Sequence, residues 1–256
     1  MKKLMALMAI AGASVCTAAT VTLKSTDGGG NSSFTDSARW SDGNPPTSGN
    51  DYVVASGRAM RTPQYYVTSA GVTTNAVFAG DSLTLGDGTS AGMLVIKTTA
   101  RNTYKGSAVV TVGDLRLANA GSYVQHAGNE QDARLCGKIT FSVPQESITD
   151  SAVPYLTGNE DRYLDVYSEL VSAAGCGFKV KLYDGSLPIH IALMSDNPSY
   201  LGYIASEGDK VYLTAESAGA LGPEPETPTA LMNLRNGGAF GVEYNDVTID
   251  QPNRGI

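Results

Sequence analysis

The chain repeats one short pattern twice, as Asp81-Ser82-Leu83-Thr84-Leu85 and as Asp114-Leu115-Arg116-Leu117. Each copy has an acidic residue after a glycine, then alternating apolar residues, then a turn of small residues. Alternation with a period of two is typical of a β-strand with one buried face. Residues 118–124 then read as a turn followed by a new strand. The pattern favours coils that stack and bury their inward residues against one another.

Short apolar or β-branched segments occupy much of the remaining chain, and turns rich in Gly, Asn and Asp separate them. The expected strands are Val21–Leu23, Asp51–Ala55, Val72–Phe78, Ser82–Leu85, Met93–Thr98, Ala108–Val112, Leu115–Ala118, Lys138–Val143, Phe178–Tyr183, Lys210–Thr214 and Val247–Ile249. The best helix candidate is Arg162–Ala174, although the same segment also fits two strands. We therefore predict an all-β protein, built as a sandwich, a barrel or a solenoid.

The first 19 residues have the pattern of a signal peptide. Lys2 and Lys3 precede an apolar run too short to span a bilayer, and Thr17-Ala18-Ala19 supplies small residues at a cleavage site. We expect a mature chain that begins near Thr20 and is secreted or displayed on the outer cell surface. No later segment approaches about 18 consecutive apolar residues, so we expect no transmembrane helix in the mature chain.

Charge and cysteine content change when residues 1–19 are removed. Basic residues fall from 18 to 16 against 25 acidic ones, which leaves a net charge of −9. Such a surface repels nucleic acid, and we expect no nucleic-acid partner. Cys136 and Cys176 remain, and an even pair in an exported protein can form a disulfide. The alternative is two free thiols packed as small hydrophobic groups, and the sequence leaves both open.

Two regions of the sequence resemble a known family. Residues 193–222 carry Leu193, Asn197, Tyr200, Gly202 and a closing Leu-Gly pair at 221–222, which is similar to the autotransporter-associated β-strand repeat. The segment 40–63, with a Gly-Asn-Asp-Tyr-Val-Val run, resembles an entry motif of large secreted bacterial β-helix proteins of the same broad group. This sequence departs from the repeat at Ser195, where a glycine is usual, and lacks a Gly-Thr pair after Gly202.

The resemblance implies a fold and an incomplete chain. It implies a right-handed parallel β-helix of the passenger type, exported and either surface-displayed or released. In similar proteins the Arg-Gly-Ile stretch that ends this sequence begins a further strand. The domain prediction is therefore a signal peptide, residues 1–19, followed by a β-solenoid, residues 20–256, truncated at its C-terminus. A β-sandwich remains the alternative fold.

Few residues in this chain offer catalytic chemistry. Gly88-Thr89-Ser90-Ala91-Gly92 matches the nucleophile-elbow pattern, but a strand pattern follows it where an elbow needs a helix. His126 and His190 are the only histidines, and we expect both to be hydrogen-bonded structural residues. Two histidines and two cysteines without short spacing predict no zinc site. We therefore name no catalytic residue, cofactor or metal ligand.

Carboxylates and tyrosines leave other roles open. Asp132 with Arg134, or the cluster Glu160-Asp161-Arg162, could line the groove of a glycan-cleaving enzyme, although a solvated turn is the favoured interpretation. Tyr200 and Tyr203 lie near turns, where exposed rings would contact a sugar or a partner protein. The favoured alternative is that such rings stack in the core or at the edge of neighbouring coils.

The sequence therefore favours a non-enzymatic secreted or cell-surface β-helix protein for adhesion or for glycan or matrix contact. A polysaccharide lyase or glycoside hydrolase on a β-helix is one alternative, and whether the chain is an enzyme stays open. A β-sandwich carbohydrate-binding module is another. Three or more carboxylates converging with Arg or Lys on one concave strip would favour the enzyme.

Overall fold

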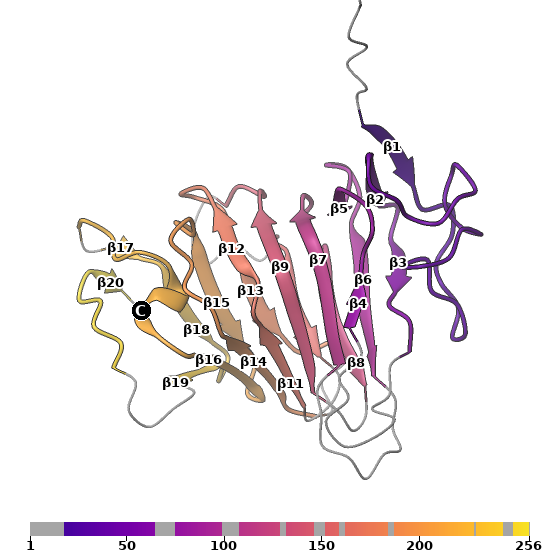
Figure 1. The fold of residues 1–256 in the computed structure, drawn as a ribbon. Helices are drawn as coiled ribbons and strands as arrows, with labels where there is room; N and C mark the ends of the chain where they lie inside the picture. Colours follow the sequence, from indigo (N-terminus) through magenta and orange to yellow (C-terminus); the bar gives the residue numbers. More distant parts are fainter. Residues whose placement is uncertain are drawn as a thin grey trace, which may run out of the picture.

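The computed structural model describes residues 18–64, 75–98, 108–128, 132–145, 152–158, 162–183, 187–227, 229–242 and 248–255. The described chain is a β-solenoid whose strands run in parallel from coil to coil (Figure 1). Every pairing between its strands is parallel, and only isolated bridges are antiparallel. The predicted parallel β-helix is thus confirmed, and the β-sandwich alternative, which needs antiparallel strands, is wrong.

Two sheets form the walls of the solenoid. The long sheet contains, in spatial order, β1 (Ala19–Thr22), β2 (Asn50–Val54), β5 (Ser82–Leu85), β7 (Ala108–Leu117), β9 (Ala133–Phe141), β11 (Tyr163–Val166), β14 (Ile189–Leu193), β16 (Val211–Ala215) and β19 (Ala239–Val242), with β4 (Asn75–Val77) beside β7 and β12 (Glu169–Ser172) beside β9. The short sheet contains β3 (Arg58–Arg61), β6 (Gly92–Thr98), β8 (Tyr123–Gly128), β10 (Tyr155–Gly158), β13 (Gly177–Lys181), β15 (Tyr203–Glu207) and β18 (Met232–Arg235). A separate pair joins β17 (Thr229–Ala230) to β20 (Arg254–Gly255).

The repeated pattern that opened the sequence lies on adjacent coils. Leu83 pairs with Leu115 and Leu85 with Leu117, so the inward leucines of one coil stack on those of the next. The ladder continues from Leu115 to Ile139. All of these side chains are at most 1% exposed. Burying such a side chain contributes about 1.5–3 kcal/mol, and the repetition of these ladders forms the apolar interior.

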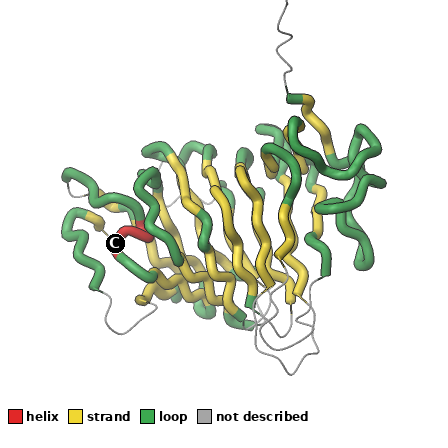
Figure 2. The backbone as a smooth tube through the Cα atoms, viewed as in Figure 1, coloured by secondary structure: helices red, strands yellow, loops and turns green. Residues whose placement is uncertain are grey.

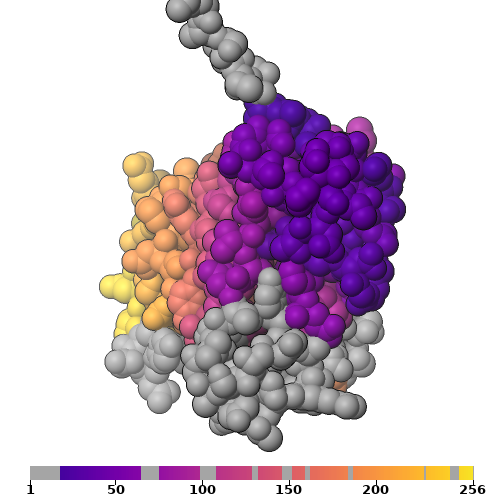
Figure 3. All heavy atoms as spheres, turned by 45° about the vertical axis from the view of Figure 1, so that its right-hand side comes forward, coloured from indigo at the N-terminus to yellow at the C-terminus, as the bar shows by residue number. Residues whose placement is uncertain are grey.

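An aromatic cluster closes the N-terminal end of the solenoid. Trp40 packs edge-on against Tyr52 with ring centroids 4.8 Å apart, and Tyr52 packs against Phe78 at 5.3 Å. Phe34 also contacts Phe78, and all four rings are buried. The segment that carries Phe34 and Trp40 covers this end of the molecule (indigo in Figure 3). The first coils are therefore shielded from water by this cap.

Several predicted strands are present in the structure, but their bounds differ and other strands were not predicted. The predicted strands Ala108–Val112 and Leu115–Ala118 form one strand, β7, with a register shift between Val112 and Leu115. The helix candidate 162–174 forms two strands, β11 and β12, as its alternative interpretation allowed. The strand pattern missed β3, β10, β14, β15, β18 and β19, and also the short pair β17 and β20.

Some predictions fall partly or wholly outside the described residues. The structure does not describe residues 1–17, so the signal peptide remains a prediction, and β1 begins at Ala19 beside the expected mature start. Val247 also lies outside the described residues, while residues 248–250 form no strand. The described part of the chain has a single helical turn, η1 (Ala218–Leu221; red in Figure 2), and holds no helix long and apolar enough to cross a membrane.

Cys136 and Cys176 are both free, so the disulfide alternative is wrong for this structure. Cys136 lies in β9, five residues before Phe141, whose ring stacks on Phe178 just beyond Cys176. A strand rises about 3.3 Å per residue, which places Cys136 roughly 16 Å along β9 from that contact. Burial raises the pKa of both thiols, which disfavours the reactive thiolate.

Candidate functional site

A groove on the outer face of the short sheet is the best-formed candidate site in the described residues. Outward side chains of three neighbouring strands form its floor, and alternate residues of each strand contribute because side chains alternate along a strand. Arg61 of β3 is in register with Val95 of β6, and Val95 with Gln125 of β8. The full floor comprises Ala59, Arg61, Met93, Val95, Lys97, Tyr123, Gln125 and Ala127.

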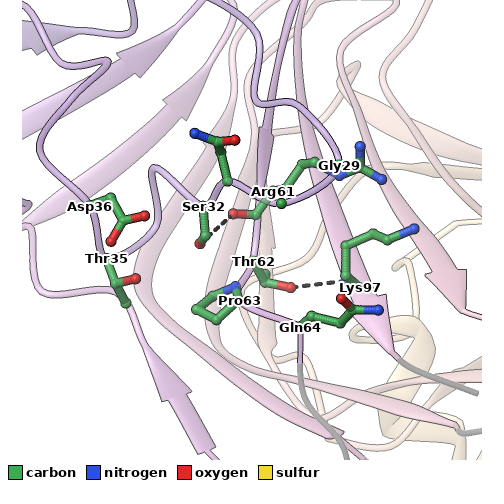
Figure 4. Close-up of a pocket in the computed structure, with 11 residues that line it drawn as sticks. Gly29, Ser32, Thr35, Asp36, Arg61, Thr62, Pro63, Gln64 and Lys97 are labelled. Carbon is green, nitrogen blue, oxygen red and sulfur yellow. Dashed lines mark hydrogen bonds between the residues drawn. The ribbon is translucent and has the colours of Figure 1, made fainter. Parts of the chain in front are cut away.

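The groove consists of two adjoining hollows that share Arg61 and Lys97. The first, of about 240 Å³, lies between the loop that contains Gly29 to Asp36 and the end of β3 (Figure 4). The second, of about 280 Å³, lies over β3, β6 and β8 and extends to Tyr183. The cationic ends of Arg61 and Lys97 point to the same side in Figure 4. Two strands therefore place two positive groups where the hollows meet.

Asp27 fixes the N-terminal wall of the groove against β3. Its carboxylate accepts hydrogen bonds from the backbone N–H of Ser33 at 2.8 Å, from the Ser33 hydroxyl at 2.7 Å and from the backbone N–H of Arg61 at 2.9 Å. Arg39 adds an ion pair at 3.5 Å. The Asp27 side chain is buried, and a buried carboxylate is stable only when paired and hydrogen-bonded in this way. Both oxygens of Asp27 are thus engaged in holding the wall.

Arg61 has a guanidinium without a partner among the described residues. Its backbone is fixed, since its N–H donates to Asp27 and its carbonyl accepts from the Ser32 hydroxyl at 2.8 Å. Its Nε atom is buried and has no acceptor. A buried donor without an acceptor costs about 1–3 kcal/mol, and more when charged, so such an atom in a folded protein requires an explanation. The unpaired guanidinium lines both hollows.

Lys97 and Asp36 complete the charged lining that the described residues supply. The backbone N–H of Lys97 donates to the Thr62 hydroxyl at 2.9 Å, which aligns β6 with the end of β3. Asp36, on the loop opposite, is the exposed acid of the first hollow. With Asp27 already paired to Arg39, the groove lining carries two cations against one exposed carboxylate. These two cationic side chains lie on a chain whose net charge is negative.

Tyrosines form the far end of the groove. Tyr123 stacks on Tyr155 of the next coil with ring centroids 4.7 Å apart, and Tyr183 lies 5.8 Å from Tyr123. The Lys181 ammonium lies 3.9 Å from the Tyr155 ring centroid. Burial raises the pKa of Tyr155 to about 12, and burial also raises the pKa of Tyr123, so both hydroxyls stay protonated at neutral pH. Tyr183 is 49% exposed and offers the accessible ring.

The nucleophile-elbow match at Ser90 forms a structural turn. The Ser90 hydroxyl donates to Asp87 at 3.0 Å and accepts from the backbone N–H of Ser56 at 2.7 Å. Hydrogen bonds from the Thr89 side chain and from Ser90 lower the pKa of Asp87. Gly92 is required for stacking, because a Cβ there would lie 1.8 Å from the carbonyl oxygen of Val54. Ser90 thus joins two coils, and a strand follows it as the sequence predicted.

Both histidines lie in side-chain ladders between coils. His126 is buried, with its Nε2 atom 3.3 Å from the Thr98 hydroxyl. His190 stacks between Tyr163 and Tyr212 on the outer face of the long sheet, with ring centroids 4.7 and 4.8 Å away. Neither imidazole lines the groove.

The carboxylate candidates also serve contacts between coils. Asp132 accepts from the backbone N–H of Tyr163 at 3.1 Å, and Arg134 pairs with Asp165 at 3.8 Å on the long sheet. Glu160 and Asp161 of the other cluster lie outside the described residues, and Arg162 is exposed. Among the described residues, no three His, Cys, Asp or Glu side chains come close enough to hold a metal ion.

The two predicted surface tyrosines have different environments. The surface-contact prediction for Tyr200 is wrong, and the alternative of a ring in the core is right: the ring is fully buried and packed edge-on against Phe141 and Phe178. Its hydroxyl donates to the backbone carbonyl of Tyr203. The turn before Tyr200 directs the side chain inward. Its aromatic ring then packs in the core, and its hydroxyl makes a hydrogen bond to a backbone carbonyl. Tyr203 is half-buried and lines a separate hollow of about 260 Å³ with Leu201 and Leu231.

Comparison of the chain with protein-family models, curated proteins and solved structures found no match. The resemblance to the autotransporter-associated repeat therefore remains a prediction. Three of the residues that carry it have clear structural roles. Asn197 and Tyr200 are buried, and at Gly202 a Cβ would lie 2.2 Å from the carbonyl oxygen of Cys176.

The sequence did not predict the groove. Its residues lie on strands whose pairing depends on coils of unequal length, and Arg61, Val95 and Gln125 carry no motif in the linear sequence. The available signal was the strand alternation of 93–98, which places Met93, Val95 and Lys97 on one face. Only the register between coils adds Arg61 and Gln125 to that face.

Proposed function

We propose that this protein is an exported, non-enzymatic β-helix protein that binds a glycan in the groove over β3, β6 and β8. The supporting observation is the groove itself, which combines an exposed ring at Tyr183, the amide of Gln125 and two cationic side chains on a rigid floor. Sugar ligands need both kinds of contact, since a ring face packs on their C–H groups and polar side chains bind their hydroxyls.

The shape of the site fits a chain-like ligand. Neighbouring strands lie about 4.8 Å apart, so the three strands of the floor span roughly 10 Å along the solenoid axis before the walls are added. The first hollow extends the site past β3 to the loop with Gly29 and Gly30. An oligosaccharide of several residues therefore fits the groove better than a single sugar.

An enzyme on this scaffold has less support. A lyase or hydrolase requires acidic or basic groups positioned around the bond that breaks. Within the described part of the chain, the carboxylates that line the groove are Asp27, whose oxygens are engaged in the wall, and Asp36. We therefore favour binding without cleavage.

Replacement of Tyr183 by alanine tests the site. We expect the Tyr183→Ala variant to bind oligosaccharides about ten-fold more weakly, because the exposed ring face is lost, while Tyr183→Phe keeps most of the affinity. Calorimetric titration of the full chain with cellotetraose, chitotetraose and tetragalacturonate measures this.

Tyr212→Ala is the matched control, because Tyr212 is 40% exposed but lies on the long sheet. It should bind like the native chain. Equal losses in both alanine variants, or native binding by Tyr183→Ala, would contradict the assignment, as would release of shorter sugars during incubation.

A further inference from the structure

We infer that the groove selects acidic glycans and that Arg61 binds the carboxylate or sulfate group of one sugar residue. This inference rests on the proposed glycan-binding function and specifies the class of ligand. It is based on the environment of Arg61 and on the sign of the charge around it.

Arg61 has a fixed backbone and a guanidinium that can bind an anion. Its backbone is fixed by Asp27 and Ser32, so the side chain starts from a rigid strand. By contrast, Arg39, Arg116 and Arg134 pair with carboxylates. The guanidinium of Arg61 has no such partner among the described residues, and its buried Nε lacks an acceptor. A planar carboxylate or a sulfate supplies two oxygens that match the fork of a guanidinium.

The surroundings of Arg61 favour an anion over a neutral group. Arg61 is paired in register with Val95 on the adjacent strand, and Lys97 follows Val95 by two residues. Lys97 also lines both hollows. Among the described residues, the acids that line the two hollows are Asp27, which is paired to Arg39, and Asp36 on the outer loop. The described lining thus presents the cationic side chains of Arg61 and Lys97 on a chain whose net charge is −7. The opposite charge of the remaining surface repels anions that do not fit the groove.

The polar neighbours of Arg61 point to a sugar as the carrier of the anion. Gln125 lies in the same row of the floor, one strand beyond Val95, and Asn31 and Gln64 line the first hollow. Amide groups both donate and accept, as the hydroxyls of a sugar require. Tyr183 closes the far end with an exposed ring. A uronic acid or a sulfated sugar presents all the matching groups in one ligand.

The test compares charged and neutral ligands on matched variants of the full chain. Trigalacturonate carries carboxylates, a heparin-derived tetrasaccharide carries sulfates as well, and cellotriose is the neutral probe. We expect the native chain to bind at least one acidic probe ten-fold or more tightly than cellotriose. Arg61→Gln should lose that ten-fold preference, because its affinity for the acidic probe falls much more than its affinity for cellotriose, and Arg61→Lys should fall between Arg61→Gln and the native chain. Arg116→Gln, an exposed arginine on the long sheet, is the control and should bind like the native chain.

Salt dependence and folding separate the outcomes. The Arg61→Gln variant should lose affinity for the acidic probes, and its dissociation constant should depend less on salt concentration than that of the native chain. Its thermal unfolding should match the native chain. Equal binding of acidic and neutral probes, or no effect of Arg61→Gln, overturns the inference but leaves glycan binding intact. Absence of binding to every probe overturns the proposed function. Competition by poly-glutamate as strong as by the acidic sugars overturns the assignment to a glycan.

Discussion

Replacement of Trp40 by alanine is expected to lower the free energy of unfolding by about 3–5 kcal/mol, the range for a large aromatic residue in a core. Trp40 is fully buried and packs on Tyr52, and its indole Nε1 donates to the carbonyl of Ser33 at 2.7 Å. Truncation leaves a cavity in the aromatic cap and removes the hydrogen bond to the Ser33 carbonyl. The same loop forms the wall of the groove, so binding should weaken as well.

Three variants with different expected losses of unfolding free energy test the role of Trp40. Trp40→Phe keeps an aromatic ring but removes the donor to Ser33, so it should cost less than Trp40→Ala. Leu201→Ala removes a side chain that is 49% exposed and should cost under about 0.5 kcal/mol. Urea unfolding followed by far-ultraviolet circular dichroism suits all three variants, since Trp40 is the only tryptophan. A Trp40→Ala cost no larger than that of Leu201→Ala would contradict a cap that shields the coils.

Replacement of Asn197 by alanine is expected to lower the free energy of unfolding by about 2–6 kcal/mol. The Asn197 side chain accepts from the backbone N–H of Leu170 at 2.7 Å and donates to the carbonyl of Ala220 at 2.6 Å. It therefore links the coil before it to the turn after it. The side chain is buried, and its removal leaves one donor and one acceptor unpaired, each at about 1–3 kcal/mol.

The position of Asn197 gives this variant a distinctive signature. In a solenoid each coil contacts mainly its neighbours, so a defect near Asn197 should open that end first. Circular dichroism of Asn197→Ala should then change at lower urea than the fluorescence of Trp40, which reports the opposite end. Asn44→Ala, at an exposed turn, is the control and should leave both transitions unchanged. Coincident transitions at the native midpoint would contradict the role of Asn197 in joining coils.

The sequence predicted the architecture from local features. The alternation around Leu83 and Leu115 indicated inward ladders, and the structure pairs these two residues on adjacent coils. The weak helical pattern at 162–174 does not produce a helix. The segment forms two strands instead, and both pair with β9. Burial at turns was harder to predict. Tyr200 follows a turn and has a polar tip, which suggested exposure, yet packing against Phe178 buries it.

The candidate site could not be read from the sequence, because it depends on contacts between coils. Arg61 aligns with Val95 and Val95 with Gln125 across two different intervals along the chain, so no fixed period identifies the row. The unpaired state of the Arg61 guanidinium is likewise visible only once its neighbours are placed. Strand alternation predicts which residues share a face, whereas the register decides which faces meet.

Parallel coils in register place Arg61, Val95 and Gln125 side by side to form the groove. The most direct test is cross-linking of Val95→Cys with Gln125→Cys, in a chain with serine at positions 136 and 176. Parallel neighbours lie about 4.8 Å apart, within the range that a disulfide spans. We predict rapid closure of this pair under mild oxidation, measured by loss of free thiols and by peptide mass. The offset pair Val95→Cys with Ala127→Cys, about 8 Å apart, should stay open. Closure of the offset pair, or of neither pair, would contradict the register between β6 and β8.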